Sequence, residues 1–164
     1  MRLSYRSAII FSGLLWLAIG ILLLSKGLSY LVVAGSAHLE GTLQGFSLLM
    51  QIDRFVENPE KSAIVLVSVG LVLGFFKGRM VMKKAVNRVV KRIRSLPPPV
   101  PVTAVYSKGY LCLIVGMTLM GISLKFLPIP IDVKGFVDFT VGTALINGAM
   151  LYFRAAFEPA DKVA

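Results

Sequence analysis

The sequence is poor in the residues that build reactive sites. It has one cysteine, one histidine and eight acidic residues in a chain of 164. A single cysteine excludes an intramolecular disulfide and a metal site made of several cysteines. A single histidine, outside the apolar stretches, leaves neither a histidine pair for haem nor a Ser-His-Asp set. The sequence also lacks a phosphate-binding loop, so it indicates no enzyme, no metal and no cofactor.

Charge is scarce as well, and apolar residues take its place. Hydrophobic residues make up 56% of the chain, charged residues 16%, and the mean hydropathy is +0.79. Soluble domains have about 45–50% apolar and about 25% charged residues. A soluble chain of this length could not hide so much apolar surface in one core. The composition therefore predicts an all-α integral membrane protein.

Four stretches have the roughly 17–25 mostly apolar residues that a membrane-spanning helix needs. They are residues 7–26, 60–78, 109–127 and 135–153. The second has a clear start, with Asn58 as cap and Pro59 at the first helical position. We predict a single membrane domain over 1–164 with four transmembrane helices. A cleaved signal peptide is the alternative for the first stretch, whose apolar run exceeds the 7–15 residues typical of such signals.

The basic residues are unevenly distributed along the chain. Nine of the 18 lie between Lys77 and Lys108, a stretch without any acid. Residues 27–61 instead have four acids against two bases. Because loops rich in lysine and arginine stay in the cytoplasm, we predict four crossings with both termini and the basic loop cytoplasmic. The small size and compact loops favour a bacterial inner (plasma) membrane.

Residues 36–57 are too polar to span. Their apolar residues recur at steps of three and four, at Leu39, Leu43, Phe46, Leu49, Ile52 and Val56. That spacing predicts one helical face, and hence an interfacial helix on the outer membrane surface. Gly41 and Gly45 weaken a helix here, so an irregular loop is the alternative.

Residues 79–96 predict a basic amphipathic helix that continues the second span and ends at Pro97. Its apolar face contains Met82, Val86, Val89 and Ile93. Its basic residues, which we expect to contact lipid headgroups, are Lys83, Lys84, Arg88, Lys91, Arg92 and Arg94. Such a helix should rest on the anionic inner leaflet, although a cluster that only fixes orientation would look the same. Nucleic acid is not an expected partner, because no aromatic residue interleaves the basic ones.

Small residues recur at every fourth position in two of the predicted spans. The second span has Gly70, Gly74 and Gly78, and a shift of 70 residues places Thr140, Ala144 and Gly148 in the fourth. Small residues at this spacing let helices approach closely in lipid. We predict that they pack helices, in this chain, in a homo-oligomer or against a membrane-complex partner. The match also indicates a tandem two-helix repeat, with chance coincidence as the alternative.

A few polar residues fall within the predicted spans, where burial without a partner is costly. They are Thr118, Ser123, Asp138 and Asn147. A pair with Lys134, one helical turn away, accounts for Asp138 without a function. Asn147 either joins two helices or lines a pathway. His38 and Glu40, outside the spans, are expected to be a solvated pair.

These observations favour a non-catalytic, helix-packed membrane protein, that is, a subunit, an assembly factor or a scaffold that contacts anionic lipid of the inner leaflet. The alternative is a small oligomeric transporter or channel with a path lined by the polar residues of the third and fourth spans. A membrane-bound enzyme would need an activity that depends on Asp138.

Overall fold

The computed structural model describes residues 2–43, 45–97, 100–101, 115, 119, 123 and 126–158. Its helices are α1 (Tyr5–Leu39), α2 (Leu48–Val56), α3 (Pro59–Ser95) and α6 (Ile131–Phe157). Two short strands, β1 (Arg2–Leu3) and β2 (Val100–Pro101), pair antiparallel with Arg2 opposite Pro101. Apart from this pair and the connections, the described chain is helical, which confirms the all-α class.

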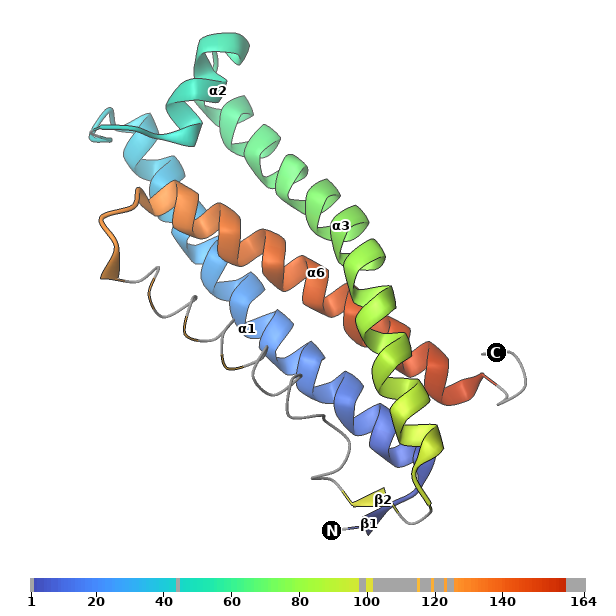
Figure 1. Ribbon diagram of the computed structural model, residues 1–164. Helices are drawn as coiled ribbons and strands as arrows, with labels where there is room; N and C mark the ends of the chain where they lie inside the picture. Colours follow the sequence, from blue (N-terminus) through green and yellow to red (C-terminus); the bar gives the residue numbers. More distant parts are fainter. Residues whose placement is uncertain are drawn as a thin grey trace.

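The three long helices form an elongated bundle (Figure 1). α2 lies at one end, where α1 finishes and α3 begins, and the strand pair lies at the other. We call these the α2 end and the basic end. α6 packs against both other long helices, and the order of its contacts makes it antiparallel to α1 and parallel to α3. It is therefore the central element of the bundle.

Three of the described helices are long and apolar enough to cross a membrane, namely α1 with 35 residues, α3 with 37 and α6 with 27. At about 1.5 Å per residue each exceeds the roughly 30 Å hydrocarbon layer. They support the prediction of a membrane protein. The fourth predicted span, 109–127, lies almost wholly outside the described residues. Within it the structure describes four helical residues, Val115, Leu119, Ser123 and Phe126. Four crossings therefore remain a prediction.

Local chemistry sets the helix starts. The Ser4 side chain accepts a hydrogen bond from the Ser7 amide at the start of α1. Asn58 does the same for the Lys61 amide at the start of α3, with Pro59 at the first helical position as predicted. α1 continues past the predicted end at residue 26 as far as Leu39, and Lys26 is exposed on its surface. The predicted segments 60–78 and 79–96 are one continuous helix.

The predicted helical face across 36–57 is wrong in one respect. Only 48–56 forms a separate helix, because Gly41 and Gly45 adopt positive φ and residues 40–43 and 45–47 are not helical. Leu49 is buried, whereas Leu39 and Phe46 are exposed. The six apolar residues of this segment therefore do not share one face.

Two apolar clusters hold the bundle together. At the basic end, α1, α3 and α6 bury large side chains against one another, among them Trp16, Val86, Ile93 and Tyr152. At the α2 end, Leu31, Leu49, Leu66 and Phe139 form a smaller cluster that includes α2. Between the clusters the helices meet largely through small residues.

Candidate lipid-contact surfaces and helix seams

The predicted glycine row of α3 faces α6. A Cβ built on Gly74 would lie 2.6 Å from the Thr140 carbonyl oxygen, and one on Gly78 would lie 2.5 Å from the Ala144 Cα. Gly148 of α6 lies against the Met82 side chain, and Gly70 lies next to Thr140. Real side chains do not tolerate such distances to backbone. The six small residues are thus brought together in one seam within the chain.

A second seam, between α1 and α6, was missed by the sequence analysis. Gly13, Gly20 and Gly27 of α1 face α6, and Gly135 and Gly142 of α6 face α1. A Cβ on Gly142 would lie 2.5 Å from the Leu24 amide nitrogen. The spacing of seven residues between these glycines is the sequence pattern that could have revealed the seam, since it returns to one helix face every two turns.

These seams change the interpretation of the small residues. Because both rows are used within the chain, they are not available for packing against another copy. The parallel course of α3 and α6 is compatible with a tandem repeat, but the repeat itself stays a prediction.

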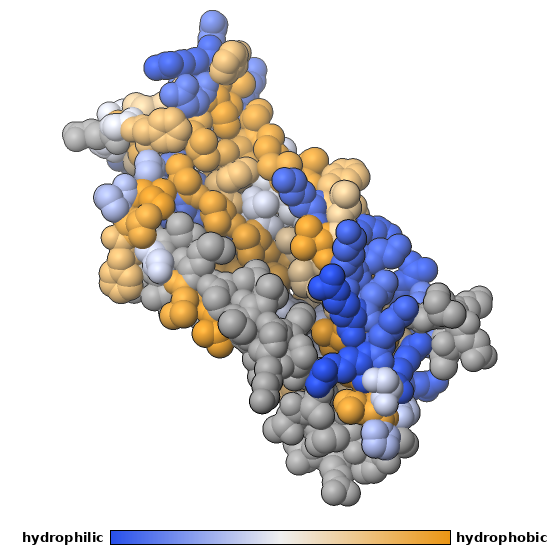
Figure 2. Space-filling view, in the orientation of Figure 1, coloured by the Kyte–Doolittle hydropathy of each residue, from blue (hydrophilic) through white to orange (hydrophobic). Residues whose placement is uncertain are grey.

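The basic residues of α3 lie on its outer side at the basic end, where Figure 2 shows a hydrophilic patch. Lys77 and Arg79 are also exposed, but they lie among apolar side chains. From residue 83 onward the exposed ones are Lys83, Lys84, Arg88, Lys91 and Arg92. We call these five residues the basic face. Arg94 differs, since it is partly buried and donates hydrogen bonds to the carbonyl oxygens of Ala155 on α6 and of Glu158, the residue that follows α6. Arg94 therefore holds the end of α6 to α3.

The opposite, apolar side of the same helix segment was predicted to rest on a membrane surface. It is instead buried within the bundle. Val86, Val89 and Ile93 are at most 4% exposed and pack against α1 and α6. The apolar stripe is buried because the long α1 and α6 reach far enough to cover it. The basic face of this segment is exposed.

The polar residues predicted to line a pathway bond within their own helices. Asn147 Nδ2 donates to the Thr143 carbonyl oxygen at 3.0 Å, and Ser123 Oγ donates to that of Leu119 at 2.9 Å. Thr143 is buried and donates to Phe139 in the same way. Thr118 lies outside the described residues. The described part of the chain therefore brings no set of these polar groups into a shared path.

Asp138 makes an ion pair that its own helix does not predict. Its carboxylate lies 3.1 Å from Lys26 Nζ on α1, and the Asp138 side chain is 14% exposed against 45% for Lys26. Lys26 also lies over the Tyr30 ring, 5.4 Å from its centroid. The long-range pair joins α1 to α6 and gives Asp138 a structural role.

The α2 end is organised by a buried carboxylate that the sequence analysis missed. Asp132 is fully buried, and one oxygen accepts from Ser47 Oγ and from the amides of Leu48 and Leu49. The other accepts from the Val133 amide at the start of α6. One carboxylate thus serves two helix N-termini, where negative charge is favourable. Its neighbours in the sequence are apolar or lysine, so no local pattern marks it.

His38 is not the solvated residue that was predicted. Its side chain is 9% exposed, and Nε2 lies 3.5 Å from an Asp53 carboxylate oxygen on α2. Ser62 of α3 donates to the other oxygen of Asp53 at 3.1 Å. The three residues connect α1, α2 and α3. In a catalytic triad the histidine lies between the carboxylate and the serine, whereas here the Asp53 carboxylate lies between His38 and Ser62, so the serine is not activated.

No group of three or more His, Cys, Asp or Glu residues that could hold a metal occurs among the residues described. Comparison with protein-family models, with curated proteins and with solved structures gives no match. Any function must therefore be argued from the surfaces and seams themselves.

Proposed function

We propose that this chain is a non-catalytic, helix-packed membrane protein that serves as a subunit, assembly factor or scaffold and binds anionic lipid headgroups through its basic face. The proposal places the basic end and both termini in the cytoplasm, with four crossings of a bacterial inner membrane. In this arrangement the basic face contacts the inner leaflet.

One observation carries the proposal, namely the position of the basic face relative to the apolar surface of α3. Exposed apolar side chains occupy the helix up to Val81, including Ile64, Val72 and Phe76. Exposed basic residues begin at Lys77 and Arg79, in the last turn of this apolar surface, and continue from Lys83 to Arg92. Cationic side chains directly beyond an apolar belt lie at headgroup level, where anionic phosphates are within reach.

The non-catalytic part of the proposal rests on how the described polar groups are used. Asp132 and Asp138 bond to other helices of the bundle, and Asn147 bonds to the backbone of its own helix. Groups committed to holding helices together are poorly placed to act on a substrate. A packed bundle with a charged face suits a partner or lipid platform better than a reaction site.

The test compares two triple variants of the full-length protein. Replacing Lys83, Lys84 and Lys91 with glutamine removes three charges, whereas replacing the same residues with arginine retains them. Each basic residue near an anionic surface contributes about 1 kcal/mol, so the glutamine variant should bind phosphatidylglycerol up to about a hundredfold more weakly. The arginine variant should bind as the wild type does.

The measurement is the phosphatidylglycerol retained per protein, relative to phosphatidylcholine, by native mass spectrometry from mixed micelles. Equal retention by the glutamine variant and the wild type would refute the role of the basic face. Because all three lysines are exposed, circular dichroism should show the same helix content in all proteins.

A further inference from the structure

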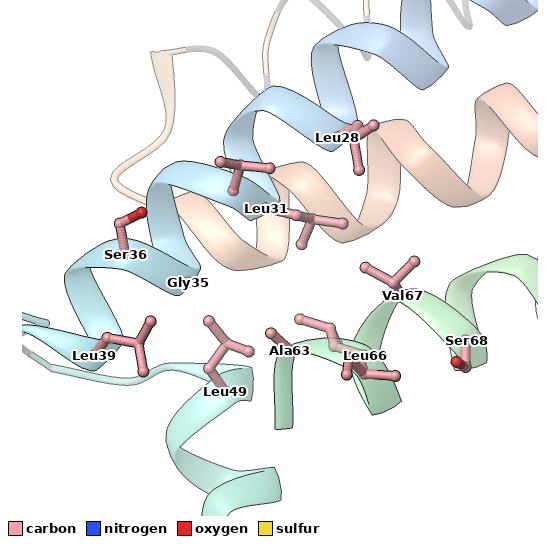
Figure 3. A pocket seen from close by; sticks show the side chains of 12 residues that line it. Leu28, Leu31, Gly35, Ser36, Leu39, Leu49, Ala63, Leu66, Val67 and Ser68 are labelled. Carbon is pink, nitrogen blue, oxygen red and sulfur yellow. The ribbon is translucent and has the colours of Figure 1, made fainter. Parts of the chain in front are cut away.

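A groove of about 400 Å³ lies between α1 and α3 at the α2 end. Figure 3 shows side chains from three helices around it. The apolar ones include Leu28, Leu31 and Val32 of α1, Leu49 of α2, and Ile64 and Leu66 of α3. Ser36 and Ser68 are the polar residues of the lining. The volume falls within the range of small-molecule sites.

The groove exists because small residues face each other where no tight seam forms. A Cβ built on Gly35 would meet a single neighbour, the Ala63 Cβ, at the ordinary contact distance of 3.9 Å. Most glycines of the two seams, by contrast, lie directly against the backbone of the neighbouring helix, as Gly27, Gly78 and Gly142 do. Leu49 of α2 closes the groove at its end and is 1% exposed.

The mouth of the groove lies in apolar surface. Val32 is 60% exposed, Leu39 is 58% and Ile64 is 65%. Both helices that carry these rims are long and apolar enough to span a membrane. Hydrocarbon chains are therefore what the rims would meet in a bilayer.

Neither bound water nor an empty space suits the groove. A bound water needs two to four polar partners, and the lining offers two serine side chains. An empty groove would leave its lining atoms without dispersion contacts on one side. A flexible hydrocarbon chain can enter from the side and fill the space without leaving a polar group unpaired.

The charges around the α2 end select among lipids. The connections, α2 and the start of α3 expose the carboxylates Glu40, Glu57 and Glu60 against the cations Arg54 and Lys61. Glu40 directly follows Leu39, which lines the groove. A headgroup with an ammonium and no net charge fits this surface better than an anionic one.

We propose that the groove binds one acyl chain of a zwitterionic, ammonium-bearing phospholipid, with the headgroup near Glu40. The site shares no residue with the basic face and lies at the other end of the bundle. Failure of one proposal therefore leaves the other standing.

The experiment uses the full-length protein in phosphatidylcholine vesicles that contain a trace of phosphatidylethanolamine with a photoreactive group in one acyl chain. After irradiation, cross-linked residues are located by mass spectrometry. We expect cross-links to concentrate at Val32 and Ile64, above the level at Leu22 and Phe76. The latter two are 70% and 62% exposed on the same helices but outside the groove.

A groove-filling variant supplies the control. Gly35→Leu should lower cross-linking at Ile64 to the level found at Phe76, because the new side chain takes the space of the lipid chain. Val33→Leu should leave it unchanged, since Val33 is exposed and does not line the groove. Ala63→Leu, which fills the groove from the other side, serves if Gly35→Leu does not fold.

Three results would overturn the proposal. The first is an even spread of cross-links over exposed apolar residues. The second is equal or stronger cross-linking with phosphatidylglycerol that has the same photoreactive chain. The third is a protein–protein cross-link at Val32 or Ile64, which would mean that a second copy fills the groove.

Discussion

The two halves of α3 differ in the residues that they bury and in those that they expose. From Pro59 to Gly78 the buried positions are mostly small, including Ser62, Gly70, Gly74 and Gly78, while the exposed ones are mostly apolar. From Arg79 to Ser95 the buried positions are Val86, Val89, Val90 and Ile93, and most exposed ones are basic or polar. One helix thus carries two kinds of surface and two kinds of core.

The two halves of α3 differ in the way expected for helix segments in different solvents. In water, burial of large apolar side chains drives helix packing. In hydrocarbon that force is absent, and close approach through small residues takes over. We therefore propose that α3 passes from lipid into an aqueous or headgroup region near residues 78–82, where the pattern changes.

The largest effect is expected in the half with the large-residue core. Ile93→Ala should lower the free energy of unfolding by about 3 kcal/mol, because Ile93 is fully buried and its removal leaves a cavity. Val81→Ala should cost far less, since Val81 is 64% exposed. Both free energies are measured by reversible denaturation in mixed micelles. Equal losses for the two variants would contradict a large-residue core in this half of α3.

A smaller effect is expected in the half with the small-residue seam. Gly78→Ala should cost about 2 kcal/mol, because the new methyl group would meet the Ala144 backbone. Gly35→Ala is the matched glycine control, because its Cβ would meet only the Ala63 Cβ at an ordinary contact distance, and it should be neutral or slightly stabilising. The same titration measures both. A Gly78→Ala protein as stable as the Gly35→Ala protein would mean that no tight seam exists.

The smallest effect concerns the α2 end, which polar contacts rather than a large core hold in place. Asp132→Asn should weaken the attachment of α2 by about 1 kcal/mol, since an amide cannot accept from every donor that the carboxylate serves. Amide hydrogen exchange in residues 48–56 should rise severalfold.

Glu60→Gln is the control for that change, because Glu60 is an exposed carboxylate in the first turn of α3. It should leave exchange in 48–56 unaffected. If Asp132→Asn also leaves it unaffected, the buried carboxylate does not fix α2.

The features of α3 that are local in sequence could be predicted. Asn58 and Pro59 mark its start, and the steps between Val86, Val89 and Ile93 mark its apolar stripe. What that stripe touches was predicted wrongly as the membrane surface. Periodicity identifies a face but not its partner, and here the partners lie in α1 and α6.

The polar contacts show the same limit. Lys134 is one turn from Asp138 and is an obvious local partner, whereas Lys26 lies more than a hundred residues away. Asp132 looks like an ordinary loop residue until the fold brings Ser47 and the start of α2 to it. The roles of Asp132 and Lys26 depend on contacts between distant segments, and no local sequence pattern predicts such contacts.

The most direct test of the boundary in α3 is a nitroxide label placed at Val72 or at Arg88 in a Cys112→Ala protein reconstituted in vesicles. Both positions are exposed, so collision rates report the surroundings and not burial. The account predicts that oxygen, which concentrates in hydrocarbon, relaxes the label at Val72 more strongly, and that a water-soluble nickel complex does so at Arg88. The same accessibility pattern at both positions would contradict it.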